Sequence, residues 1–166
     1  ARRNHDQMTI RPVYPLESER LRLEPFQESD INELYVMERD PEVKRYGGGV
    51  LTRAQAEKLL KRFVAQVRDT GWGAVAMKER ATGRIVGLCG IYETENPQEA
   101  ELFYGLARDA WGQGYATEAA KALMLASLRE WGVLRIVVPV NPENVRSIRV
   151  LEKIGMRFSH VVTDPE

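Results

Sequence analysis

The segment Asp109–Ala120 (DAWGQGYATEAA) constrains the fold of this chain more than any other, because it joins two stretches with different hydrophobic periods. Residues 100–107 carry Leu, Tyr and Leu at every second position, which is typical of a β-strand. Residues 116–131 instead repeat apolar residues every three or four positions and are followed by a glycine, which predicts an amphipathic helix. Gly112 and Gly114 therefore lie where a strand ends and a helix begins.

A glycine-rich approach to a helix is suited to binding an anion. The first N–H groups of a helix have no partner inside the helix, and glycine lets the backbone approach a ligand without a Cβ in the way. A phosphate group fits such a site. The alternative is that Gly112 and Gly114 only form a tight turn, with Trp111 packed in the core.

Two common nucleotide-binding motifs do not match this segment. A phosphate loop of the Walker type needs Gly-Lys-Ser/Thr, but Gly114 is followed by Tyr-Ala. A dinucleotide fingerprint needs a third small residue, where this chain has Thr117, and an acidic residue after the next strand. The strand predicted at 134–140 ends in Asn-Pro instead.

Residues 111–116 resemble the pyrophosphate-binding loop of the GNAT superfamily of N-acetyltransferases, whose pattern is Arg/Gln-x-x-Gly-x-Gly/Ala. Trp111 departs from that pattern at its first position. The form Trp-Gly-x-Gly-Tyr-Ala-Thr-Glu-Ala is similar to the branch that acetylates the N-termini of ribosomal proteins. Residues 141–156 resemble a second signature of this branch, Asn-x-x-Ser-x-x-Val-Leu-Glu-Lys-x-Gly. The resemblance covers residues 21–158.

The resemblance implies an α/β (α+β) fold with a mixed, mostly antiparallel sheet and helices on both faces. Two splayed parallel strands would form the coenzyme cleft, and Pro139 fits a strand that leaves its neighbour because proline has no N–H to donate. We expect a single domain over residues 8–166, with 1–7 a flexible or appended end. The family adds one more strand, so the C-terminus is expected to be natively short, trimmed or completed by another chain.

Local patterns predict the individual elements. Thr52 to Gln55 reads as a capping box, and charged residues with a proline bound the helix before it. The glycines at 47–49 interrupt these two helices, and the loop they form is either a wall of the acceptor site or a simple connector. The predicted order is a first strand at 21–23, helices at 31–40 and 52–67, a hairpin of 72–78 with 84–92, the strand at 100–107, the helix at 116–131, a strand at 134–140, a helix at 145–154 and a final strand at 158–162.

Composition favours a small-molecule or peptide substrate over a polyanionic partner. Lys plus Arg and Asp plus Glu number 24 each, so no net field attracts nucleic acid or an anionic membrane. Cys89 is predicted to be buried and structural, and His5 and His160 form no metal or triad set with other residues. We expect no metal, a cytoplasmic location, and a monomer or homodimer.

Coenzyme-binding residues follow from the resemblance alone. The backbone amides of Leu106, Ala107 and Arg108 would bind the pantetheine arm and the thioester oxygen. Those of Gln113, Gly114, Tyr115, Ala116 and Thr117 would bind the pyrophosphate. Residues 112–117 are here called the cradle. Asn144 and Ser147 would bind the amide arm, although Asn144 is equally suited to cap a helix. The Arg108 side chain would meet a phosphate or form an exposed salt bridge. Glu118 must point away, because its charge would repel phosphate.

The implied reaction is acetyl transfer from acetyl-CoA to an amine. Glu101 is the candidate base, since it lies on the strand that leads to the thioester; the alternative is a polar residue on an open sheet face. Many relatives place a tyrosine acid where this chain has Leu151, so Ser147 or water is expected to supply that proton. A protein α-amine, with a pKa near 8, needs little help to lose its proton.

Several alternatives remain open on the residues alone. The acceptor is a protein N-terminus or a small molecule such as a polyamine or an antibiotic. A non-catalytic coenzyme-binding or sensing module would retain the cradle without turnover. A purely structural interaction domain is disfavoured, because it gives no reason for the cradle beside Asn144 and Ser147.

Overall fold

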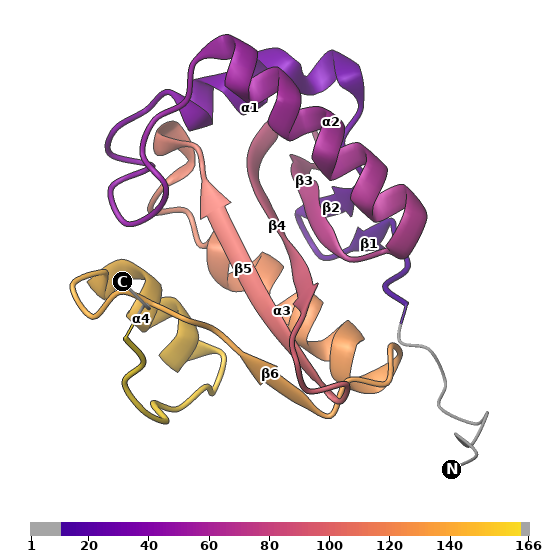
Figure 1. The fold of residues 1–166 in the computed structure, drawn as a ribbon, viewed down its shortest axis with the longest axis vertical. Coiled ribbons are helices and arrows are strands. Elements are labelled where there is room, and N and C mark those ends of the chain that lie inside the picture. Colours follow the sequence, from indigo (N-terminus) through magenta and orange to yellow (C-terminus); the bar gives the residue numbers. More distant parts are fainter. Residues whose placement is uncertain (1–10, 164–166) are drawn as a thin grey trace.

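Six strands form one sheet, and they lie side by side in the order of the sequence. The computed structural model describes residues 11–163, so His5 and the first seven residues lie outside the described part. Helices α1 and α2 cover one face of the sheet and α3 covers the other (Figure 1). The elements are β1 Leu16–Glu17, β2 Leu21–Glu24, the 3₁₀ helix η1 Glu28–Asp30, α1 Ile31–Glu38, α2 Arg53–Thr70, β3 Gly73–Glu79, β4 Ile85–Glu93, β5 Glu99–Leu106, the 3₁₀ helix η2 Arg108–Ala110, α3 Tyr115–Arg129, β6 Arg135–Val137 and α4 Val145–Lys153.

The sheet separates two hydrophobic layers. Successive side chains of a strand point to opposite faces. On β3, Val75 and Met77 pack in the cluster that contains α3, whereas Ala74 and Ala76 pack with α1 and α2. Strands β1 to β5 are antiparallel neighbours, and β6 is parallel to β5 because α3 crosses between them. The predicted fold class, with a mixed, mostly antiparallel sheet and helices on both faces, is confirmed.

The capping box before α2 forms as the sequence predicts. The Gln55 amide donates to Thr52 Oγ1 at 3.2 Å, and the Thr52 amide donates to Gln55 Oε1 at 2.9 Å. The helix ends at Gly71, whose φ of 80° is left-handed. These two local signals fix both ends of α2.

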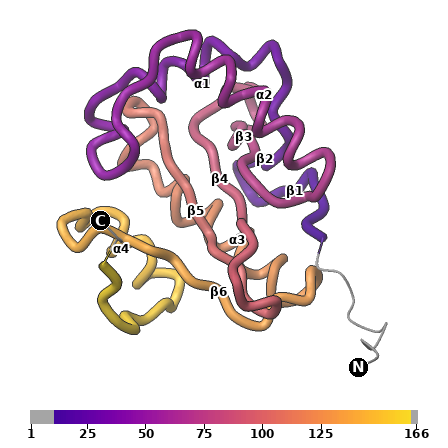
Figure 2. The backbone as a smooth tube through the Cα atoms, in the orientation of Figure 1, coloured from indigo at the N-terminus to yellow at the C-terminus, as the bar shows by residue number. Residues whose placement is uncertain are grey.

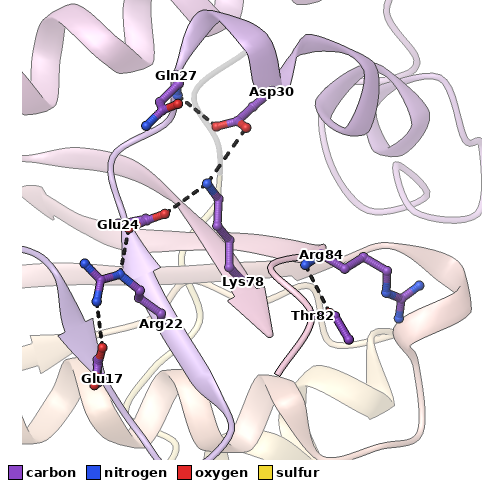
Figure 3. Close-up of polar contacts among 8 residues, drawn as sticks. All are labelled: Glu17, Arg22, Glu24, Gln27, Asp30, Lys78, Thr82 and Arg84. Atoms are coloured by element: carbon purple, nitrogen blue, oxygen red, sulfur yellow. Dashed lines mark hydrogen bonds and ion pairs between the residues drawn. The ribbon is translucent and has the colours of Figure 1, made fainter. Parts of the chain in front are cut away.

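A chain of ion pairs joins the start of α1 to the sheet (Figure 3). Lys78 Nζ on β3 lies 2.9 Å from Glu24 Oε1 and 3.9 Å from Asp30 Oδ1. Arg22 then links Glu24, at 2.8 Å, to Glu17 of β1, at 2.7 Å. Asp30 is buried, and a buried carboxylate requires such partners. The network therefore holds η1 and α1 over β2 and β3.

Strands β5 and β6 separate after a short paired stretch. Only residues 99–101 pair with residues 135–137, and β5 then continues to Leu106 paired with β4 on one side and with no strand on the other. The predicted strand at 134–140 is thus shorter than expected, and Pro139 lies where pairing has stopped. Figure 2 shows the tube after β6 turning away from β5 toward α4. Residues 135–153 are here called the β6–α4 arm.

Two strand predictions need correction. The final strand predicted at 158–162 is wrong, because residues 156–163 contain no strand. Phe158 and Val161 are 83% and 78% exposed, and a segment forms no strand without a neighbouring strand to pair with. The strand at residue 21 is not the first, since the two-residue β1 precedes it and pairs with it.

Cys89 lies in the middle of β4 and is fully buried, as predicted. Burial raises the pKa of its thiol far above the ordinary value, so the thiol stays protonated and unreactive. Within residues 11–163 no group of His, Cys, Asp and Glu side chains could hold a metal ion. No helix in this part of the chain is long and apolar enough to cross a membrane.

Candidate active site

The cradle has the backbone geometry of an anion site. Gly112 and Gly114 have φ angles of 77° and 81°, and Gly114 is the N-cap of α3 with no side-chain cap. The Glu118 amide donates to the Gly114 carbonyl at 3.1 Å, whereas the three amides before it, at residues 115–117, have no acceptor within the described residues. A Cβ added at Gly112 would meet nothing within 4 Å. Free amides beside open space are what an anion at a helix N-terminus requires.

Arg20, which sequence reasoning missed, supports the cradle from the β1–β2 turn. Its Nη1 donates to the Gln113 carbonyl at 2.8 Å, and its guanidinium carbon lies 4.4 Å from the centre of the Tyr115 ring. Its Nε also donates to Glu118 at 2.7 Å. Arg20 belongs to neither motif and is 93 residues from Gln113, so no local pattern could have indicated it.

Glu118 is turned away from the free amides, as a phosphate site requires. Its carboxylate accepts hydrogen bonds from the Ser18 hydroxyl and, at 2.8 Å, from the Arg20 amide. Burial tends to raise the pKa of Glu118, but these bonds and the Arg20 charge outweigh it, so the pKa lies below the usual value. The carboxylate is therefore ionised and neutralised by Arg20.

The β3–β4 hairpin supports the cradle segment through side-chain hydrogen bonds. The Tyr115 hydroxyl donates to Glu79, and this bond, with a second from Thr82, lowers the pKa of Glu79. Arg84 Nη1 donates to Asp109 Oδ2 at 2.9 Å. The Tyr115 phenol is therefore engaged with the hairpin, while its main-chain amide has no acceptor within the described residues.

Trp111 connects the end of β5 to the start of α4. Its Nε1 donates to the Leu106 carbonyl at 3.2 Å, and the Arg146 guanidinium carbon lies 4.3 Å from the centre of its ring. A cation–π contact of this kind is worth about 0.5–1 kcal/mol at an exposed site. Trp111, which departs from the usual motif, thus links β5 and α4 to the cradle segment.

The free edge of β5 offers backbone groups to the gap. The Ala107 amide donates to the Val86 carbonyl at 2.9 Å, so it is engaged with β4. In an antiparallel pair the amide direction alternates, hence the amides of Tyr104 and Leu106 point to the side that β6 has left. The Arg108 side chain forms an ion pair with Asp40 at the end of α1, the salt bridge that the sequence left as one alternative.

Asn144 and Ser147 meet at the start of α4. Asn144 is the N-cap, and its Oδ1 accepts from the Ser147 amide at 3.2 Å. Ser147 Oγ lies 2.8 Å from the hydroxyl of Tyr104 on β5, a second residue to which sequence reasoning assigned no role. Leu151, one turn further on, is buried. The helix therefore presents a hydroxyl, and the sheet supplies a phenol beside it.

Glu101 lies on the other face of β5. It is in register with Tyr92 of β4, and the Tyr92 and Phe103 rings stack with centroids 4.9 Å apart. Phe103 packs toward α1 and α2, and alternation places Glu101 on that same face. Glu101 and Ser147 are thus separated by the sheet strand that carries Tyr104.

The α1–α2 loop reaches the β6–α4 arm. The Tyr46 hydroxyl donates to the Glu143 carbonyl at 3.2 Å. Gly48 and Gly49 follow with φ angles of 66° and 69°, so the chain reverses directly after this contact. The loop is more than a simple connector, since it crosses to the arm.

Comparison with known proteins identifies the family. Residues 20–157 match the acetyltransferase (GNAT) domain. The uncharacterised protein YkkB of Bacillus subtilis is 31% identical over 150 residues, which cover 89% of this chain and 87% of that protein. The chain belongs to the GNAT acetyltransferase family. The resemblance to the GNAT superfamily drawn from the cradle and the α4 signature is therefore confirmed.

Solved GNAT structures share the fold. An acetyltransferase from Agrobacterium tumefaciens has a TM-score of 0.78 at 27% identity, covering 93% of this chain and 90% of that one. RimL, a ribosomal-protein alpha-N-acetyltransferase in complex with coenzyme A, has a TM-score of 0.70 at 19% identity, with coverages of 83% and 80%. An aminoglycoside acetyltransferase in complex with coenzyme A has a TM-score of 0.71 at 23% identity, with coverages of 87% and 88%. These two likenesses concern the fold alone, and the two proteins act on different acceptors.

Proposed function

We propose that this GNAT protein transfers the acetyl group of acetyl-CoA to a primary amine, by direct attack of the amine within a ternary complex. The acceptor we favour is a protein N-terminal α-amine. The observation that carries the proposal is the row of unpartnered amides at the start of α3, which opens beside the gap between β5 and the β6–α4 arm. Family membership makes acetyl-CoA the acetyl donor.

The residues around this gap suit the parts of the coenzyme. The cradle amides of Gln113, Gly114, Tyr115, Ala116 and Thr117 would bind the pyrophosphate, because they are free and the Glu118 charge is neutralised. The amides of Leu106 and Arg108 would bind the pantetheine arm and the thioester oxygen. Asn144 and Ser147 would bind the amide arm from the opposite side. Ala107 contributes through its position only, since its amide is engaged.

The bound thioester supplies an activated acetyl carbonyl; this chain's residues supply proton transfer. Glu101 would accept the proton of the incoming amine, directly or through water, from the face that α1 and α2 cover. An α-amine titrates near pH 8, so only a modest base is needed. Ser147, on the arm, would donate a hydrogen bond to the departing sulfur.

Direct attack is favoured over a covalent acetyl-enzyme because of the state of Cys89. It is the only cysteine of the sequence, and it is completely buried with a raised pKa. A protonated thiol in the core cannot take an acetyl group from a ligand in the gap. Initial rates should accordingly show intersecting rather than parallel double-reciprocal lines.

One experiment tests the proposal and its alternatives together. Thermal melts with acetyl-CoA, NAD and ATP test the coenzyme, and only acetyl-CoA should raise the melting temperature. Release of free thiol is then followed with N-terminal peptides, polyamines and aminoglycosides. Peptides should give the highest kcat/KM. Binding without thiol release from any amine would indicate a sensing module, and a preference for a small amine would overturn the peptide assignment.

A further inference from the structure

Tyr104 bridges the gap between β5 and the β6–α4 arm. Its phenol oxygen lies 2.8 Å from Ser147 Oγ and 3.2 Å from the Ser147 carbonyl oxygen. Backbone pairing of β5 with β6 ends at Glu101, three positions earlier, so this contact lies beyond the last paired residue. The amide of Tyr104 also faces the gap, by the alternation described above. Both the amide and the hydroxyl of Tyr104 thus lie at the gap, where the proposed function places the thioester.

At this distance either hydroxyl can donate, so the chemistry of the two groups, rather than the geometry, sets the direction of the bond. A phenol, with a pKa near 10, is a stronger donor than an aliphatic hydroxyl, and Ser147 Oγ is the nearer of its two acceptors. When Tyr104 donates to Oγ, the proton of the serine is directed elsewhere. The Ser147 amide is fixed at the same time by Asn144 Oδ1. Ser147 therefore keeps one free donor with a restricted direction.

The surroundings keep the phenol in its protonated form. Tyr104 is half-buried, and this burial raises its pKa, with the bond to Ser147 opposing the effect more weakly. A phenol that keeps its proton acts as a donor, not as a base. Leu151, buried one helical turn from Ser147, offers no competing hydroxyl.

We propose that Tyr104 is a positioning residue for acetyl transfer, which holds Ser147 Oγ so that its proton faces the sulfur of the departing coenzyme A. The inference rests on the proposed function and assigns the residue that orients its leaving-group donor. It places this support on the sheet, in a residue of β5, rather than on α4.

The proton path is complete without a further reagent. The acceptor nitrogen attacks the carbonyl carbon, the C–N bond forms, and the C–S bond breaks with its electron pair on sulfur. Ser147 Oγ gives its proton to sulfur and takes one from Tyr104. The proton that leaves the acceptor nitrogen passes to Glu101, directly or through water, and from there to solvent, which returns one proton to Tyr104.

The kinetic test compares Tyr104→Phe with Ser147→Ala and with the double variant. Phenylalanine keeps the ring and removes only the hydroxyl. We expect Tyr104→Phe to lower kcat about tenfold, the effect of one hydrogen bond, with the KM for acetyl-CoA unchanged. The double variant should be no slower than Ser147→Ala alone, because Tyr104 acts only through Ser147. Additive losses, or a loss confined to KM, would overturn the proposal.

A second test needs no turnover and separates this inference from the proposed function. The thiol of bound coenzyme A is titrated by the ultraviolet absorbance of its thiolate. A donor held toward sulfur stabilises the thiolate, so the pKa of the bound thiol should be about one unit lower in the parent protein than in Tyr104→Phe. Equal values in the two proteins would refute the inference even if acetyl transfer is confirmed. If the parent protein acetylates no amine but its bound thiol still has a lower pKa than in Tyr104→Phe, the inference is supported and the proposed function fails.

Tyr14→Phe is the matched control. Within residues 11–163 the buried Tyr14 hydroxyl has no hydrogen-bond partner, and the Tyr14 ring packs edge-on against Trp131, outside the gap. The same chemical change there should leave both kcat and the pKa of the bound thiol at the parent values. Should Tyr104→Phe fail to fold, Ser147→Ala tests the same thiol pKa from the other partner, and an unchanged value would refute the inference.

Discussion

The two sides of the coenzyme gap are built differently. On the cradle side, Arg20 and Glu79 reach the start of α3 from two other parts of the sheet, and Arg20 makes three hydrogen bonds there and Glu79 one. The β6–α4 arm has three paired residues, and α4 buries only Leu151 completely enough to count as core. Side chains with few buried contacts open at low free-energy cost. We infer that the rigid side binds the constant phosphates, while the looser arm adjusts to the reacting groups.

The largest expected effect comes from straining the rigid side. Gly114→Val should abolish the rise in melting temperature with acetyl-CoA, because valine is strained at a φ of 81° and its Cβ would lie 3.4 Å from Arg20 Nη2. Gly155→Val is the control, since Gly155 lies just after the arm, at a φ of 89° with open space around it. It should keep the coenzyme response. Equal losses in both variants would mean that strain, not the cradle, is responsible.

Removing the donor on the arm should affect turnover much more than binding. Ser147→Ala is expected to lower kcat about a hundredfold, less if water replaces the hydroxyl, with little change in the Kd of acetyl-CoA because Asn144 and the cradle still bind the coenzyme. Steady-state assays with a peptide acceptor measure kcat, and calorimetric titration measures the Kd of acetyl-CoA. Ser127→Ala serves as the control, because it removes a buried α3 hydroxyl that has no hydrogen-bond partner in the described part of the chain. If coenzyme affinity falls while kcat holds, Ser147 is a binding residue only.

A smaller effect should follow from removing the support of the cradle while leaving its backbone intact. Arg20→Ala loses the bonds to Gln113 and Glu118 and frees a carboxylate charge near the phosphate site. We expect acetyl-CoA affinity to fall about tenfold, with kcat at saturation nearly unchanged. Arg22→Ala, which breaks only the exposed pairs with Glu17 and Glu24, should bind normally. Similar affinities in the two variants would contradict the bracing role.

The smallest effect on acetyl transfer is expected from a substitution in the sheet, at Cys89, which belongs to neither side of the gap. Cys89→Ala should leave acetyl transfer close to the parent rate, since no step uses this thiol. The missing sulfur leaves a small cavity and is expected to cost about 1–2 kcal/mol of folding free energy. Denaturant melts and steady-state rates measure the two outcomes. An acetylated Cys89 isolated from the enzyme would overturn direct attack.

Features that depend on neighbouring residues in the chain could be predicted, and those that depend on distant ones could not. Thr52 with Gln55, and the glycines of the cradle, carry their geometry in a few consecutive residues. Arg20 and Tyr104 act on groups 93 and 43 residues away, and a single sequence holds no signal for such a contact. The predicted strand at 158–162 failed for the same reason. A strand forms only when a second strand pairs with it, and the residues of 158–162 carry no information about that partner.

The complete burial of Cys89 has a practical consequence. The folded chain shows no thiol to a reagent in solution, so every thiol counted during turnover belongs to the coenzyme product. A slow additional signal, reaching one thiol per chain, would report opening of the sheet around β4. A single thiol assay therefore reports both catalysis and unfolding, on separate timescales. It distinguishes a folded but inactive variant from an unfolded one without a second probe.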